Sequence, residues 1–127
     1  MRAKYLVIIA VFLFNIPSFA QWKSYYPEIQ KSKKEQEKID REKNKKQFDS
    51  CFFSAIKAKS LEDYDEALKY FEKCINLDSK NASPYYESAI INTAKGGYMV
   101  AVEQIKAAVK LEPRNRWFIL LYAEILF

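Results

Sequence analysis

Few residues in this chain have the types and spacings that support chemistry. The 127 residues include no His and two Cys, so acid–base catalysis by His and metal sites built on His are excluded. Cys51 and Cys74 lack the C-x-x-C spacing of a zinc site or a redox-catalytic pair. The acidic cluster Asp63, Asp65 and Glu66 lies at a predicted helix start, where acids cap free amides and favour the helix dipole. No nucleophile–base pair or Gly-rich phosphate loop accompanies it, so we predict a protein that is not an enzyme and uses no cofactor or metal.

The N-terminus has the pattern of a secretory signal peptide. Arg2 and Lys4 provide a positively charged start, an apolar stretch runs from Tyr5 to Ile16, and Ser18-Phe19-Ala20 places small residues on either side of a large one. The apolar run is shorter than the ~20 residues of a membrane-spanning helix. We therefore predict that residues 1–20 are removed and that the mature protein has no integral membrane span. It is expected to be periplasmic or extracellular, with a peripheral position at a membrane as a further option.

The next segment, residues 21–47, is predicted to connect rather than to form a core. The chain has a net charge of +5, but Lys31 to Lys46 holds eight basic against four acidic residues, whereas 48–127 holds ten against eleven. The basic balance therefore belongs to this segment. It starts with three aromatic residues, which either dock on a partner or cover apolar surface of the domain. These residues are Trp22, Tyr25 and Tyr26.

The Lys-rich part of this segment is predicted to be a solvated, partly helical stalk. Ile39 is its only apolar residue, so it cannot bury a hydrophobic stripe. Glu37 with Arg41, and Glu42 with Lys46, stand four residues apart with the acid first, which favours an exposed helix. Because acids are mixed with the lysines, we do not expect nucleic acid as a partner.

A regular sequence period runs through the rest of the chain. Shifting the sequence by 34 positions aligns seven identical residues, where ordinary composition gives about two. The pairs are Ser54 and Ser88, Ala55 and Ala89, Ile56 and Ile90, Tyr64 and Tyr98, Ala67 and Ala101, Leu77 and Leu111, and Asn81 and Asn115. Ala123 continues the series from Ala89. The sequence therefore predicts repeats at 48–81 and 82–115 and an incomplete third at 116–127.

Each complete repeat is predicted to contain two helices. Their start signals are Asp63 with Glu66 as a capping box, Ser83 followed by Pro84 in the first turn, and Asn115. A Gly pair ends the helix that follows Ser83. The expected helices after the first run from the Asp63 cap to Leu77, from Ser83 to about Lys95, from Tyr98 to Leu111 and from Arg116 to Phe127. No stretch shows the two-residue alternation of a strand, so the fold class is predicted to be all-α.

With this period, residues 48–127 resemble the tetratricopeptide repeat (TPR) proteins. The resemblance rests on small residues, large apolar residues and helix entries at matching positions. They are Ala55, Ala89 and Ala123, Tyr64-Asp65-Glu66-Ala67 and Tyr98-Met99-Val100-Ala101, Phe71 and Ile105, Cys74 and Ala108, and Glu112-Pro113. Three residues depart from the pattern: Cys51 replaces a large aromatic, Ser79 a common Pro and Glu62 a common Gly. The resemblance implies antiparallel helix-turn-helix repeats stacked as a short right-handed α-solenoid.

The resemblance also implies a non-catalytic scaffold that binds a peptide or protein in a concave groove lined by the first helix of each repeat. The side chains expected to line it are mixed and rich in aromatics. They are Asp49, Phe52, Ile56, Lys59, Ser83, Tyr86, Glu87, Ile90, Thr93, Trp117, Leu120 and Glu124. The ordered Lys, Asn and Arg set with which some family members hold a terminal carboxylate is missing. Phe52 and Leu120 equally fit ordinary packing.

The C-terminal segment is unusually apolar for the last helix of such an array. Between Trp117 and Phe127, Glu124 is the only charged residue, although a closing helix normally has a polar outer face. Two explanations follow: the chain is part of a longer array, or this end contacts a partner or a second copy. The predicted contact residues are Phe118, Leu121, Ile125 and Phe127. A structural subunit held through this end is therefore the alternative to a binding scaffold.

The two cysteines are expected to lie level with each other on neighbouring antiparallel helices. An exported chain meets oxidising conditions, so a disulfide between Cys51 and Cys74 is one expectation. The other, which we favour, is that both are free and act as small apolar residues.

Overall fold

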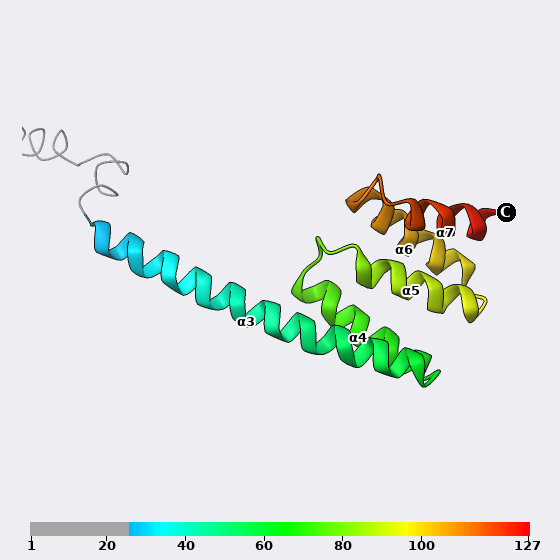
Figure 1. The fold of residues 1–127 in the computed structure, drawn as a ribbon, viewed down its shortest axis with the longest axis horizontal. Helices are drawn as coiled ribbons and strands as arrows, with labels where there is room; N and C mark the ends of the chain where they lie inside the picture. Colours follow the sequence, from blue (N-terminus) through cyan, green and yellow to red (C-terminus); the bar gives the residue numbers. More distant parts are fainter. Residues whose placement is uncertain (1–25) are drawn as a thin grey trace, which may run out of the picture. The chain divides into compact units, whose positions relative to one another are not determined.

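The computed structural model describes residues 26–127, which form an all-α fold. Its helices are α3 (Pro27–Ser60), α4 (Tyr64–Leu77), α5 (Ser83–Ala94), α6 (Tyr98–Leu111) and α7 (Arg116–Leu126) (Figure 1). No strand occurs in this part of the chain, and the predicted fold class is confirmed. The expected signal peptide, residues 1–20, lies outside the described residues, and so do Trp22 and Tyr25 of the segment that follows it.

The chain divides by its internal contacts into two units, residues 1–41 and residues 42–127. Helix α3 is continuous across this division and across residue 47, so no helix break marks the predicted start of the first repeat. The reason is local, because neither Gly nor Pro occurs between Glu28 and Ser60. Pro27 begins the helix, where its missing N–H costs nothing.

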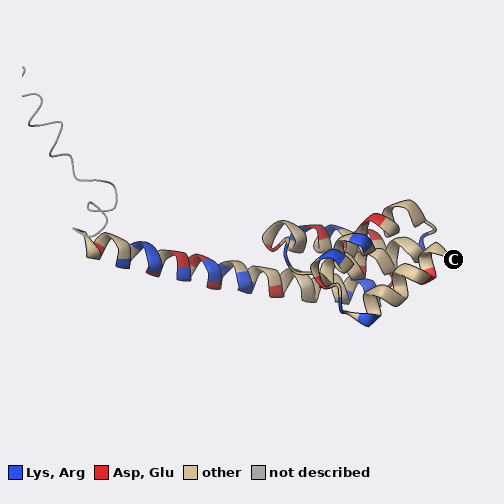
Figure 2. Ribbon diagram, turned by 90° about the horizontal axis from the view of Figure 1, so that it is seen from above, with Lys and Arg blue, Asp and Glu red and all other residues tan. Residues whose placement is uncertain are grey.

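The Lys-rich part of α3 is exposed to solvent, as a solvated stalk requires. Basic and acidic residues are interspersed along it (Figure 2). The expected ion pairs are not formed in this part of the described chain. Instead, Arg41 Nε donates to the main-chain oxygen of Glu37 at 3.2 Å, and Gln36 Nε2 donates to Asp40 Oδ1 at 3.1 Å.

Consecutive helices of residues 42–127 pack against each other in adjacent pairs. An N-terminal core cluster, built around Ala55, Ala67, Phe71 and Ile91, joins α3, α4 and α5. A C-terminal core cluster joins α5, α6 and α7, and its buried members are Ala82, Ala89, Ile105, Ala108 and Phe118. The alanines let the helices approach closely, and one large apolar side chain per contact fills the remaining space.

The period of the sequence is repeated in the backbone. Helix α6 begins and ends one full period after α4, and α5 ends one full period after α3. Four pairs of residues at this spacing are fully buried. They are Ala55 and Ala89, Ala67 and Ala101, Phe71 and Ile105, and Cys74 and Ala108. Ala123 continues the series but is exposed, because no later helix within the described residues covers it.

The turns that end α3 and α5 have the same geometry. Glu62 has φ 61° and Gly96 has φ 75°, and the two residues occupy equivalent positions of consecutive repeats. In both turns the next amide donates to a carbonyl five residues back: Asp63 N to Ala58 O at 3.0 Å, and Gly97 N to Asn92 O at 2.7 Å. A left-handed residue at this point is the usual way to end a helix. Because Gly adopts a positive φ without a steric cost, Gly suits the position that Glu62 occupies in this chain.

The predicted caps are found at two of three helix starts. Asp63 accepts from the Glu66 amide at 3.2 Å, and Asn115 accepts from the Trp117 amide at 3.2 Å. The prediction of Ser83 as a cap is wrong, because Ser83 is the first residue of α5 and donates its own amide to Asn81 Oδ1 at 3.0 Å. Pro84 lies in the first turn of α5, as expected.

Candidate functional site

The candidate site is the face to which α3, α5 and α7 contribute. Lys59 of α3 and Glu87 of α5, both predicted groove residues, are joined by an ion pair with Nζ to Oε2 at 2.5 Å. Their side chains keep 29% and 19% of their exposure, so solvent screens this pair less than a pair on an open surface. The contact neutralises the charges of both residues on this face.

A second contact joins α5 to α7. The rings of Tyr86 and Phe118 are 4.8 Å apart between centroids and tilted by 33°. Both belong to the C-terminal core cluster, Tyr86 partly buried and Phe118 buried. Tyr86 therefore packs inward and supports the face, in addition to exposing part of its ring there.

Phe52 lies in the N-terminal core cluster rather than on the open face. Its ring meets Phe71 edge-on with centroids 5.7 Å apart and stacks on Phe48 at 5.8 Å. Of the predicted groove residues on this part of α3, Asp49 and Ile56 are exposed. The packing alternative that the sequence left open is therefore the arrangement found for Phe52.

The middle of the face is formed by less exposed residues of α5. Ser83 and Ile90 are partly buried. Thr93 is also partly buried, and its hydroxyl donates to the main-chain oxygen of Ala89 at 2.8 Å. The predicted groove residues of α5 therefore give a surface of limited exposure between the more open positions of α3 and α7.

Helix α7 contributes the most open apolar part of the site. Trp117 and Leu120 are 59% and 57% exposed, and Glu124 is exposed as well. The Arg116 guanidinium lies over the Trp117 ring at 5.3 Å from its centroid. These side chains are free to contact a partner, which distinguishes Leu120 from Phe52.

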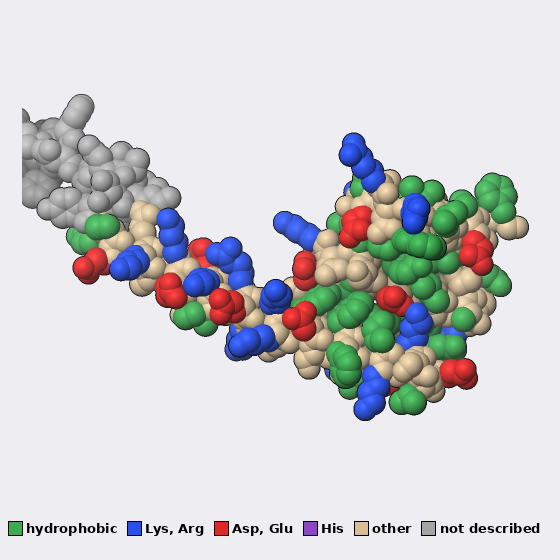
Figure 3. All heavy atoms as spheres, viewed as in Figure 1, with side chains coloured by type: hydrophobic (Ala, Val, Ile, Leu, Met, Phe, Trp, Pro, Cys, Tyr) green, Lys and Arg blue, Asp and Glu red, His purple; other side chains and the backbone are tan. Residues whose placement is uncertain are grey.

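Three of the four residues predicted to form an apolar end contact face the protein core and not solvent. Phe118 is buried in the C-terminal core cluster, and Leu121 and Ile125 pack against it. Phe127 is exposed. The apolar residues that α7 presents to solvent beside it are Ile119 and Leu126, and hydrophobic side chains reach the surface where α7 ends (Figure 3).

The sequence reasoning also missed Phe53, which is 73% exposed. It stands three residues before Ile56 and extends the apolar surface of α3. The buried or partly buried residues of this helix include Phe48, Phe52 and Ala55, three or four residues apart, and Phe53 falls outside that spacing. The sequence signal that could have identified Phe53 as exposed is its apolar side chain at a position outside the spacing of the core residues.

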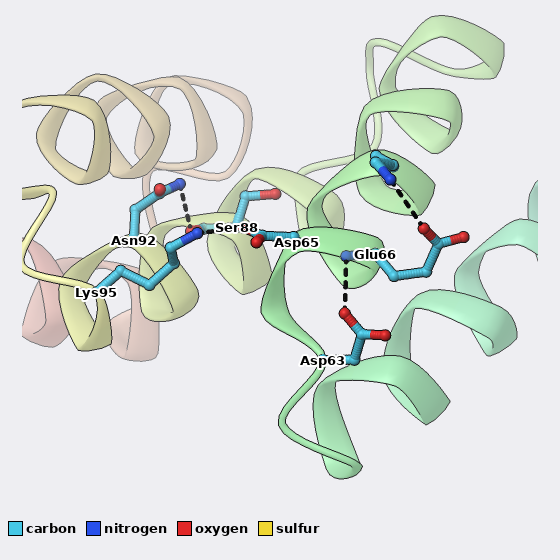
Figure 4. A network of polar contacts seen from close by, with 7 residues as sticks. Asp63, Asp65, Glu66, Ser88, Asn92 and Lys95 are labelled. Carbon is cyan, nitrogen blue, oxygen red and sulfur yellow. Dashed lines mark hydrogen bonds and ion pairs between the residues drawn. The ribbon is translucent and has the colours of Figure 1, made fainter.

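Polar contacts join α5 to α4 and to α6, and Figure 4 shows those of Asp65, Ser88, Asn92 and Lys95. Lys95 forms an ion pair with Asp65, and this contact is the main cause that lowers the pKa of the Asp65 carboxyl. Asn92 Nδ2 donates to the main-chain oxygen of Ser88 at 3.0 Å and to Gln104 Oε1 at 2.8 Å. These acids and amides have partners within the fold, and the contacts join α4, α5 and α6.

Cys51 and Cys74 are free thiols in the structure. Cys74 is buried and donates to the main-chain oxygen of Phe48 at 3.9 Å. Burial, followed by repulsion from Cys51, raises the pKa of the Cys74 thiol to about 11. Cys74 is therefore an unreactive core residue at neutral pH.

The described helices contain neither a metal-binding cluster nor a membrane span. Within residues 26–127, no group of three or more Cys, Asp or Glu side chains could hold a metal ion. In the same residues, no helix is long and apolar enough to cross a bilayer.

Comparisons with known proteins add no assignment. No protein-family model matches the chain, and no curated protein matches it in sequence. Its function is therefore inferred from the residues and their geometry.

Proposed function

We propose that this protein is an exported, TPR-like scaffold that binds a peptide or protein segment along the face formed by α3, α5 and α7. The observation that carries the proposal is the periodic repetition of helix ends and buried residues. Such repetition places equivalent helices side by side, and arrays of this kind present their first helices as one continuous surface. The Lys59–Glu87 and Tyr86–Phe118 contacts join these helices in pairs.

The exposed chemistry of this face favours an apolar segment that carries basic residues. Ile56, Trp117 and Leu120 provide apolar contacts, and Trp is the residue type most often found at the energetic centre of interfaces. Asp49 and Glu124 are exposed and unpaired within residues 26–127. Because Lys59 and Glu87 neutralise each other, the predicted groove residues that keep an unpaired charge are both acidic, and Arg116 lies beside them over Trp117.

The test uses a substitution that changes the face without removing a core contact. Ile56→Asp is expected to abolish capture of the wild-type partners from the envelope of the producing cell, because it places a carboxylate among the apolar contacts. Met99→Asp is the matched control, since Met99 lies on α6 and is 86% exposed. Equal capture by wild type and Ile56→Asp would contradict the proposal. Tyr86→Ala is unsuitable because Tyr86 packs against Phe118.

A second candidate function is that of a structural subunit held through α7. Its specific support is the exposure of Ile119, Leu126 and Phe127 on one helix, since exposed apolar clusters mark contact surfaces. Ile119→Asp is expected to release the protein from such an assembly while leaving the fold intact. Leu121→Asp does not test this idea, because Leu121 packs against the core. If Ile119→Asp still sediments with the assembly from cell envelopes as wild type does, the structural-subunit function is excluded.

A further inference from the structure

The charges of α7 are placed against its own helix dipole. Arg116 is the first residue of α7 and Glu124 lies in its last turn. In contrast, α4 has acids in its first turn and α6 has a lysine in its last turn. A cation at the N-terminal end and an anion at the C-terminal end are both unfavourable. Neither residue forms an ion pair within the described part of the chain.

The exposed residues of α7 form a stripe on the side away from the core. Phe118, Leu121 and Ile125 face inward. Residues on the opposite side recur at intervals of three or four, which places them along one helix face. This outward stripe consists of Arg116, Leu120, Ala123 and Phe127, with Trp117 and Glu124 on one flank, and all six are exposed.

A second copy of α7, laid antiparallel over the outward stripe, matches it in charge and in size. With Leu120 opposite Leu120, Arg116 lies level with Glu124 of the second copy, and Trp117 lies level with the small Ala123. The Trp117 and Ala123 level is about 4.5 Å from the centre and the Arg116 and Glu124 level about 6 Å, at about 1.5 Å rise per residue. Twofold symmetry makes every contact except the central Leu120–Leu120 contact occur twice.

This arrangement also removes the conflict with the helix dipole. Arg116 meets the C-terminal end of the second α7, where the dipole is negative, and Glu124 meets the positive N-terminal end. The charges that are misplaced for one helix are therefore correctly placed for an antiparallel neighbour of the same sequence.

We propose that this protein forms a twofold-symmetric dimer through antiparallel pairing of α7 from two copies. The inference rests on the second candidate function and names a second copy of the chain as the partner of α7, which it contacts through the outward stripe and not through Ile119 or Leu126. Trp117, Leu120 and Glu124 also belong to the scaffold face, so a partner segment and the second copy compete for these three residues. Because α7 has 11 residues, it is only about 16 Å long, and the interface is smaller than the roughly 1,200 Å² of a stable complex. The expected dissociation constant is on the order of micromolar.

The test is a charge exchange measured by sedimentation equilibrium. The protein is produced from the full sequence and studied at about 1–100 μM, a range around the expected dissociation constant. Arg116→Glu and Glu124→Arg each create two like-charge pairs, and each is expected to weaken the dimer at least about tenfold. The double variant Arg116→Glu/Glu124→Arg is expected to dimerise more tightly than either single variant, since its pairs are again opposite in charge, but more weakly than wild type, because its charges already suit the dipole of their own helix.

Mixing the two single variants gives a sharper result. In a dimer of one Arg116→Glu chain and one Glu124→Arg chain, both pairs are opposite in charge. The equimolar mixture is therefore expected to associate at least about tenfold more tightly than either variant alone. Both substitutions agree with the helix dipole of α7, so helical circular dichroism is expected to stay at the wild-type level.

Several results would overturn the proposal. They are a wild-type monomer across the whole range, single variants that dimerise like wild type, a mixture no tighter than its components, or open-ended assembly beyond the dimer. Ile56→Asp separates this inference from the scaffold function, because it alters α3 and is expected to leave the dissociation constant of the dimer unchanged. If Ile56→Asp loses partner capture and still dimerises like wild type, the result bears on the scaffold function and not on the dimer.

Discussion

At the scale of single residues, the Lys59–Glu87 ion pair is the polar contact that joins α3 to α5 on the candidate site. Half-buried pairs are screened less than pairs on an open surface, whose coupling is typically about 0.2–1 kcal/mol. Removing one member also leaves the other half-buried and unpaired. The stability of the face therefore depends on both residues together.

A double-mutant cycle measures this dependence. For Lys59→Ala and Glu87→Ala we expect a coupling free energy of about 1 kcal/mol in urea unfolding. The control cycle is Lys106→Ala with Glu103→Ala, an exposed pair within one helix, for which about 0.3 kcal/mol is expected. Equal coupling in the two cycles would mean that the α3–α5 pair contributes no more stability than an exposed pair within one helix.

The buried thiol of Cys74 gives a prediction that depends on pH. Because burial raises its pKa to about 11, the reactive thiolate of Cys74 is scarce at neutral pH. In the reduced native protein at pH 8, iodoacetamide is expected to label the partly exposed Cys51 first, with Cys74 reacting only after unfolding or as the pH rises toward 11. Intact mass follows both steps. Rapid addition of two labels at pH 8 would contradict the burial of Cys74.

At the scale of secondary structure, the sequence predicted four helices from caps, breakers and spacing. The extent of α3 was beyond that reasoning, since no apolar stripe marks its charged part and only the lack of Gly and Pro allows it to continue. The Ser83 cap was wrong because Asn81, two residues earlier, offers an equally suitable acceptor. In both cases the residues are compatible with more than one local backbone structure, and contacts with neighbouring residues determine which one forms.

The turn at Glu62 gives a prediction at this scale. Its φ of 61° is costly for a residue with a side chain, and Gly96 occupies the equivalent turn. Glu62→Gly is expected to stabilise the protein by about 0.5–1 kcal/mol, because the relief of strain exceeds the added freedom of the unfolded chain. The urea midpoint measures this change.

The matched control is the same substitution within a helix. Glu72 is an exposed residue inside α4, and Glu72→Gly is expected to lower the free energy of unfolding by about 1 kcal/mol. If both substitutions lower the midpoint, the left-handed turn at Glu62 is not a source of strain.

At the scale of the whole repeat region, the period predicted which residues are buried better than it predicted which are available to a partner. Ala55, Phe71 and their equivalents in the next repeat are buried as the pattern requires. Phe52 and Phe53 differ by one position, about 100° around a helix, yet the first packs on Phe71 and the second is exposed. Such choices depend on the shape of the neighbouring helix, which sequence spacing does not contain.

The central claim is that a partner binds along the face formed by α3, α5 and α7. Photo-crosslinking in the envelope of the producing cell tests it most directly, with a crosslinking side chain placed singly at Ile56, Leu120, Met99 or Lys69. The account predicts that Ile56 and Leu120 crosslink to the same partner, and that Met99 on α6 and Lys69 on α4 do not. Crosslinking of that partner from Met99 or Lys69 as efficiently as from Ile56 would contradict it.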